Sequence, residues 1–218
     1  VDAEYHMLGV IEIDDVMDVM EEETTEDINL MAGMSGEERV DSTVLESAKS
    51  RIPWLIVNLF TAVMAAAVVA NFESTIAKVV SLSSVMSIVT GMGGNAGTQS
   101  LTILCRGLSL GEVDKDNAFQ IFCKEVVVGL LSGIVIGIIV AFGAWWFASN
   151  PWFGLVAGLA MILNMLAANV AGYLVPVILK RLNIDPALAS GVFVTTVTDC
   201  MGFFFFLGLA TLFLPLLV

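Results

Sequence analysis

Long stretches without a charged residue constrain this chain more than any other feature. Three of them cover residues 52–72, 79–105 and 126–179, and a fourth apolar stretch, from about 186 to 214, carries one charge, Asp199. About 20 apolar residues are enough for a helix to cross a bilayer. With 57% hydrophobic and only 14% charged residues, the chain is predicted to be a membrane protein that crosses the bilayer several times.

The longest stretch divides into two spans. Ser149-Asn150-Pro151 is a turn signal, and it follows an interfacial pair of tryptophans, Trp145 and Trp146. We therefore predict an all-α fold with five transmembrane helices per chain, at roughly 53–72, 79–104, 122–148, 153–179 and 187–214.

Glycines recur every four residues in the third and fourth predicted spans. Small residues at this spacing allow helix backbones to approach closely in lipid. We favour packing within the chain, and a dimer interface is the alternative. The glycines are Gly129, Gly133, Gly137, Gly154 and Gly158.

The basic residues predict the orientation. Five spans place the two ends of the chain on opposite sides, and eight of the nine Lys and Arg fall on one side, with Lys78 alone on the other. Cytoplasmic loops are enriched in Lys and Arg, so we expect a multi-pass protein of the cell membrane with its N-terminus in the cytoplasm and its C-terminus outside. The eight are Arg39, Lys49, Arg51, Arg106, Lys115, Lys124, Lys180 and Arg181.

The first 52 residues form an acidic segment. They hold 15 of the 22 Asp and Glu but 3 of the 9 Lys and Arg, so nucleic acid would be repelled and cations attracted. Acidic residues recur at steps of three or four and line one face of a predicted helix, where divalent cations could lie between them. The alternative is a solvated helix face. The face comprises Asp15, Asp18, Glu22 and Glu26, with Glu23 and Asp27 alongside.

Asp199 lies near the middle of the last predicted span. An aspartate at the centre of a bilayer costs about 2.5 to 3.5 kcal/mol, and no Lys or Arg lies inside any predicted span to pair with it. The second span contains GMGGNAGTQS, residues 91–100, whose glycines predict local unwinding. Carboxylate, amide and carbonyl oxygens together suit a hard cation such as Mg²⁺ or Ca²⁺.

Catalytic signatures are missing from the sequence. It contains neither HExxH nor GxSxG, and we expect no second intramembrane carboxylate. The chain is therefore predicted not to be an enzyme. A pore for cations, a proton- or sodium-coupled secondary transporter, and a membrane protein that binds metal without moving it all stay open at this point.

Two motifs resemble the MgtE family of magnesium channels and transporters. They are GMGGNAGTQS and DPALASGVFVTTVTDCMG, residues 185–202. The resemblance implies a homodimer whose pore lies on the two-fold axis, with the Asp199 of each copy facing a hydrated Mg²⁺. It also implies that the pore is lined by Gly91, Gly94, Asn95, Thr98, Gln99 and Thr195. Val192 stands where a proline is common in the family. The named residues do not distinguish Mg²⁺ from Mn²⁺, Co²⁺, Ni²⁺ or Ca²⁺, because all of these ions accept oxygen ligands.

The opening GVIEIDDVMDVMEEETTED, residues 9–27, resembles the end of the family's second CBS domain leading into a cytoplasmic plug helix. The implied division is a CBS remnant at 1–13, an acidic plug and connecting region at 14–52, and an ion-conducting domain at 53–218. Because the chain starts at Val1, we expect a fragment of a longer protein. Cytosolic Mg²⁺ is expected to close the pore by binding Asp15, Asp18, Glu23, Glu26, Asp27 and Asp185.

Overall fold

Helices make up all the regular secondary structure that the computed structural model describes, which is residues 11–36, 38–114, 116–188 and 190–218. The predicted all-α fold is therefore confirmed, while most of the expected CBS remnant at 1–13 lies outside the described residues. The helices are α1 (Ile13–Met31), α2 (Val44–Ala70), α3 (Glu73–Lys78), α4 (Leu82–Ser109), α5 (Ala118–Ala148), α6 (Pro151–Arg181), α7 (Ser190–Leu212) and α8 (Leu214–Leu217).

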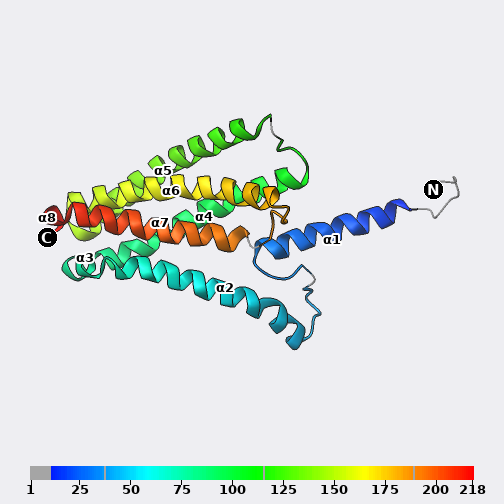
Figure 1. The fold of residues 1–218 in the computed structure, drawn as a ribbon. Coiled ribbons are helices and arrows are strands. Elements are labelled where there is room, and N and C mark those ends of the chain that lie inside the picture. The colour runs from blue at the N-terminus through cyan, green and yellow to red at the C-terminus, as the bar shows by residue number, and fades with distance from the viewer. Residues whose placement is uncertain (1–10, 37, 115, 189) are drawn as a thin grey trace.

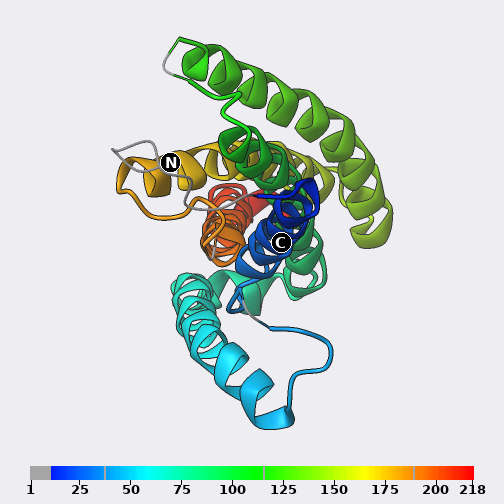
Figure 2. The ribbon, with the colours of Figure 1, turned by 90° about the vertical axis from the view of Figure 1, so that its right-hand side faces the viewer.

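Five long helices form a bundle in which α4, α6 and α7 pack against one another at the centre (Figure 1). Helix α5 covers α6, and α2 packs on α7 at the opposite side of the bundle (Figure 2). The largest fully buried side chains come from the three central helices and include Leu82, Phe153, Met161 and Phe206. Helix α1 projects from one end of the bundle, and α3 and α8 lie at the other end (Figure 1).

Four of the described helices are long and apolar enough to cross a membrane, namely α2, α5, α6 and α7. Helix α4 corresponds to the second predicted span and is not one of these four. Its 28 residues are about 42 Å long at 1.5 Å per residue, which is longer than a bilayer core, but its polar stretch lowers its hydropathy.

The predicted turn between the third and fourth spans is confirmed. Helix α5 ends at Ala148, and Ser149 adopts a left-handed conformation with φ of 52°. The Asn150 side chain then accepts a hydrogen bond from the Trp152 amide at 2.9 Å and caps α6, whose first residue is Pro151.

Four of the five bundle helices, α2, α4, α5 and α6, extend beyond the predicted spans at the end nearest α1, whereas α7 begins at Ser190, within its predicted span. Helix α2 begins at Val44, where the Glu46 carboxylate accepts a hydrogen bond from the Thr43 amide at 2.9 Å. The expected boundary at residues 52 and 53 therefore falls inside a continuous helix that contains Pro53.

The prediction that residues 91–100 unwind is wrong, because α4 is helical throughout this stretch. Two of the four glycines in this stretch, Gly93 and Gly97, leave space where neighbouring helices approach. A Cβ atom at Gly97 would lie 2.5 Å from Cγ1 of Val194, and one at Gly172 would lie 2.7 Å from the Gly97 carbonyl oxygen. Close packing against α6 and α7 therefore offsets the poor helix propensity of glycine.

The glycines of α5 and α6 pack within the chain, as we favoured. A Cβ at Gly137 would lie 2.9 Å from the carbonyl oxygen of Gly158, and a Cβ at Gly158 would lie 2.9 Å from the carbonyl oxygen of Gly137. These two glycines therefore set the close approach of α5 and α6.

Candidate functional site

Asp199 lies near the middle of α7 and is half-buried. Thr195 lies one turn earlier, on the same side of the helix, and its hydroxyl donates to the Gly191 carbonyl at 3.0 Å. Among the described residues, no salt bridge reaches Asp199. The carboxylate therefore lacks a cationic side chain in this part of the protein.

One face of α4 carries a polar stripe that the other described helices leave uncovered. Gly91, Asn95, Thr98 and Gln99 are exposed and Gly94 is half-buried. The Thr98 hydroxyl donates to the Gly94 carbonyl at 2.8 Å, which leaves its lone pairs available. Polar groups on a membrane helix are costly in lipid, so this stripe requires water or another polypeptide beside it.

Helices α4 and α7 are in contact at the level of the carboxylate. A Cβ atom at Gly94 would lie 3.9 Å from Oγ1 of Thr198, the residue before Asp199. The structure therefore brings the predicted polar stretch of α4 and the predicted aspartate of α7 to neighbouring positions. No hydrogen bond joins Asp199 to α4 in the described part of the chain.

The C-terminal end of α1 lies against the start of α7. A Cβ at Gly191 would lie 2.5 Å from the Met31 carbonyl oxygen, and Gly33, with φ of 73°, lies beside Val192. Asp27 is half-buried here and accepts a hydrogen bond from the Ser109 hydroxyl at 3.3 Å.

Asp185 lies close enough to Asp27 to influence the pKa of Asp27. Burial raises the pKa of Asp27, the Asp185 carboxylate raises it further, the hydrogen bond from Ser109 lowers it, and Glu23 raises it slightly. Two neighbouring carboxylates fit Mg²⁺, which commonly keeps several waters and binds through one or two carboxylates.

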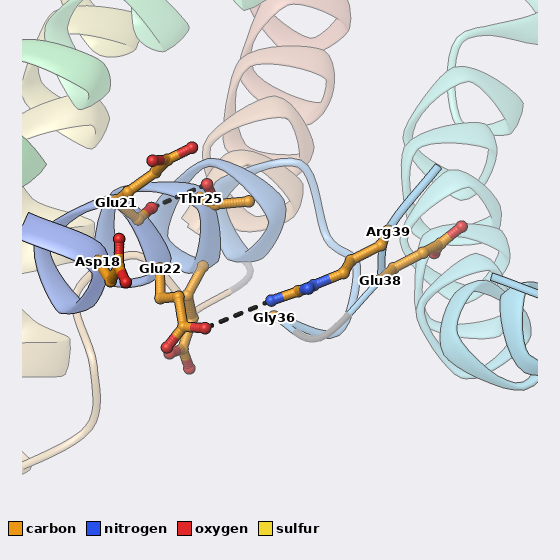
Figure 3. A pocket seen from close by; sticks show the side chains of 8 residues that line it. Asp18, Glu21, Glu22, Thr25, Gly36, Glu38 and Arg39 are labelled. Carbon is orange, nitrogen blue, oxygen red and sulfur yellow. Dashed lines mark hydrogen bonds and ion pairs between the residues drawn. The ribbon is translucent and has the colours of Figure 1, made fainter. Parts of the chain in front are cut away.

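Of the other predicted regulatory residues, Glu23 lies near enough to Asp27 to raise its pKa slightly, and Asp15, Asp18 and Glu26 are not gathered around the pair. Asp15 is exposed on the free part of α1. Asp18, labelled in Figure 3, and Glu26 both line a groove of about 600 Å³. Arg39 occupies this groove and forms an ion pair with Glu22 at 3.3 Å. The described residues contain no group of three or more Asp, Glu, His or Cys that could hold a metal ion within one chain.

Glu125 is a buried carboxylate that the sequence analysis missed. It lies near the start of α5, is 6% exposed, and accepts a hydrogen bond from the Ser100 hydroxyl at 2.7 Å. The expectation that Asp199 is the lone carboxylate within the bundle is therefore wrong. The only local signal was Lys124-Glu125 at the edge of an apolar run, where adjacent residues of a helix point in different directions.

The sequence profile of the MgtE family, described as a divalent cation transporter, matches residues 86–209. The chain belongs to the MgtE family. It is 36% identical over 215 residues to magnesium transporter MgtE of Enterococcus faecalis, an alignment that covers 98% of this chain and 47% of that protein. The magnesium transporters MgtE of Bacillus subtilis and Thermus thermophilus are 32% and 33% identical, over 95% and 98% of this chain and 46% and 48% of their own lengths. This chain thus spans about half the length of these curated relatives.

The MgtE match extends from α4 into α7. It includes Asp199, Asp185 and Glu125 together with the polar stripe of α4, whereas α1 lies outside it. The family is one of transporters and not of enzymes, which agrees with the prediction from the sequence.

Proposed function

We propose that this chain moves Mg²⁺ across the cell membrane through a pore on the two-fold axis of a homodimer. The observation that carries the proposal is Asp199, a half-buried carboxylate without a cationic partner among the described residues, on a helix inside the MgtE match. The relatives are named magnesium transporters, and Mg²⁺ is the cargo that this oxygen-rich region suits.

In the proposed topology, α2, α4, α5, α6 and α7 cross the membrane. The described basic residues of the cytoplasmic set lie in or beside the helix ends nearest α1, and Lys78 lies in α3 at the opposite end (Figure 1). The positive-inside rule then places α1 in the cytoplasm and Val218 outside.

A second copy completes the proposed pore. One carboxylate balances half the charge of a divalent ion, and the two-fold symmetry of a dimer supplies the second. The stripe formed by Gly91, Gly94, Asn95, Thr98 and Gln99, with Thr195 of α7, then faces water at the axis. Mg²⁺ loses its water reluctantly, so a wide, oxygen-lined path suits the hydrated ion, and Mn²⁺, Co²⁺, Ni²⁺ and Ca²⁺ are further candidates.

Cytosolic Mg²⁺ regulates the pore in this proposal. The ion binds first at Asp27 and Asp185 and holds α1 against the bundle, and Asp15, Asp18, Glu23 and Glu26 add to the site when two copies of α1 approach. Without the ion, the acidic residues repel one another and α1 separates. The shift requires that Mg²⁺ bind the closed state more tightly than the open one.

The first test is Mg²⁺ uptake into liposomes that contain this chain. We expect flux that follows an imposed membrane potential and does not need a proton or sodium gradient. Asp199→Asn should nearly abolish this flux while the thermal stability holds or rises, because the substitution removes the ion's charge partner and a costly carboxylate. Asp41→Asn, an exposed carboxylate in the loop after α1, is the matched control and should transport at the wild-type rate.

Three outcomes contradict parts of the proposal. Wild-type flux from Asp199→Asn would make Asp199 structural. A strict need for a proton or sodium gradient would identify a coupled transporter, and a wild-type chain that binds Mg²⁺ without moving it would identify a metal-binding membrane protein.

A further inference from the structure

We propose that Glu125 is a positioning residue that fixes the rotation of α4 and thereby sets which side chains the helix presents to the ion path. The proposal rests on the proposed function for its transport readout, and on the hydrogen bond between Ser100 and Glu125 for its geometry. Neither residue belongs to the pore-lining set or to the regulatory set described above.

Ser100 lies on the side of α4 opposite the polar stripe. Successive helical residues are about 100° apart, so Ser100 is about 200° from Thr98 and about 140° from Asn95 around the helix axis. Ser100 is 4% exposed, whereas Thr98 and Asn95 are exposed. A contact that holds Ser100 inward therefore holds Thr98 and Asn95 outward.

The Ser100 hydroxyl is enclosed by α5 and α6. It donates to Oε2 of Glu125 at 2.7 Å and lies 3.4 Å from the Asn169 carbonyl oxygen. A Cβ atom at Gly172 would lie 2.8 Å from the Ser100 Cβ, so α6 allows this part of α4 to approach only because residue 172 is glycine. In the described part of the chain, the bond to Glu125 is the side-chain hydrogen bond that links α4 to α5.

Lys124 explains how a carboxylate is tolerated at this depth. Its ammonium group lies 3.8 Å from Oε1 of Glu125 while its side chain stays 62% exposed, so the lysine reaches from the bundle surface towards the buried group. Each carboxylate oxygen thus has one neighbour, Ser100 for Oε2 and Lys124 for Oε1. Hydrogen bonds to a charged acceptor are about twice as strong as neutral ones, which makes this contact suitable for fixing a helix rotation.

The test is a double-mutant cycle on Mg²⁺ flux in liposomes, with Ser100→Ala, Glu125→Gln and the combined variant. We expect each single variant to lower the flux by about tenfold and the combined variant to be no slower than either, because both remove the same contact. Ser100→Thr keeps the hydroxyl and should retain most of the flux. Ser132→Ala is the matched control, because Ser132 lies on α5 and its hydroxyl donates only within that helix, so it should transport at the wild-type rate.

A second readout separates positioning from simple stabilisation and does not need transport. The Thr98→Cys variant is labelled with a membrane-impermeant thiol reagent. The labelling of the chain that keeps Thr98 is subtracted, which removes the signal of the native cysteines. Ser100→Ala and Glu125→Gln should each change the labelling rate at position 98 severalfold, and Ser132→Ala should leave it unchanged.

Unchanged labelling at position 98 in both variants would overturn the positioning role, even if the variants melt at lower temperature. Wild-type flux in both variants, or losses that multiply in the combined variant, would overturn it as well. If the wild-type chain moves no Mg²⁺, the proposed function fails, and the labelling experiment alone then decides the role of Glu125.

Discussion

Asn164 is the side chain at which the three central helices meet. It belongs to α6, is fully buried, and its amide donates to the Val89 carbonyl of α4 at 2.8 Å. A Cβ at Gly202 of α7 would lie 2.8 Å from the same nitrogen, and a Cβ at Gly93 of α4 would overlap the amide. Gly93 and Gly202 therefore leave space for the Asn164 side chain. Gly202 lies three residues after Asp199 in α7.

Gly93→Ala should destabilise the central helices. The added methyl group must displace the Asn164 amide, and overpacking of this kind costs about 1 to 3 kcal/mol. We expect a lower melting temperature of the purified protein in detergent. Gly143→Ala on α5 is the control, because nothing lies within 4 Å of a Cβ there, and it should leave the stability unchanged or raise it by up to about 1 kcal/mol. Equal melting temperatures for the two variants would show that α4, α6 and α7 are not closely packed at Asn164.

Helix α1 is attached to the bundle at its C-terminal end, while its residues up to 26 are almost all exposed. The contacts of Met31, Gly33 and Asp27 with α7 and Ser109 hold that end in place. An element anchored in this way can separate from the bundle without disturbing the buried core, which is the property that a gate needs.

The pH dependence of this docking follows from Asp27. Its pKa in the docked state lies above the ordinary value of 3.8, mainly because of burial and Asp185. A proton therefore binds the docked state more tightly, so docking strengthens as the pH falls through the raised pKa towards 3.8 and is weakest at neutral pH.

Without Mg²⁺, proteolysis of the loop between α1 and α2 should slow on acidification. In Asp27→Asn, proteolysis of this loop should already be slow at neutral pH, and its rate should depend less on pH than in the wild-type chain. An unchanged pH profile in Asp27→Asn would show that another group controls docking.

The inhibition of flux by Mg²⁺ can be divided between two parts of the acidic set. Asp27→Asn with Asp185→Asn removes the pair that the structure brings together, and should abolish the fall in flux as Mg²⁺ rises on the α1 side. Asp15→Asn with Asp18→Asn removes carboxylates on the free part of α1, and should weaken inhibition only if a second copy contributes to the site. If the variant that carries all four substitutions is still inhibited by Mg²⁺ as the wild-type chain is, α1 has a solvated acidic face and no gating role.

For the whole molecule, the surfaces that the bundle leaves uncovered differ in polarity. Helix α2 packs mainly on α7 and exposes large apolar residues, including Leu55, Leu59 and Phe60, as expected beside lipid. The stripe on α4 is exposed but polar, so lipid cannot cover it at low cost. A two-fold partner at this stripe would enclose water between the copies.

The dimer can be tested by cross-linking in membranes. Asp199→Cys, combined with Cys200→Ser, should join two copies through a short bifunctional thiol reagent if the axis passes between the two positions. Ser149→Cys is exposed at the turn between α5 and α6, outside the two helices that line the proposed pore, so it should give little product. A monomer by native mass spectrometry that still transports Mg²⁺ would contradict the dimeric pore.

The sequence predicted the helices better than it predicted their contacts. Uncharged runs and the turn at Ser149 to Pro151 located four long apolar helices and the break between two of them, because both signals depend on local residues and on the solvent. The start of α2 at Val44 was missed, since a helix can continue into water once Thr43 and Glu46 satisfy its first amides. The unwinding predicted for residues 91–100 was wrong, because propensity says nothing of the neighbours that α4 packs against.

By itself, the sequence determined the membrane class, the all-helical fold and the family. Hydropathy and the motifs around Asn95 and Asp199 each depend on residues that are close together in the sequence. Only the tertiary structure decided which groups meet. It placed Asp27 beside Asp185 and buried Glu125 against Ser100, and both pairs join residues from separate helices or loops. The physical reason is that burial depends on how packed helices are rotated and how closely they approach. The close contacts of Gly93, Gly97 and Gly172 set this approach, and no local sequence pattern encodes it.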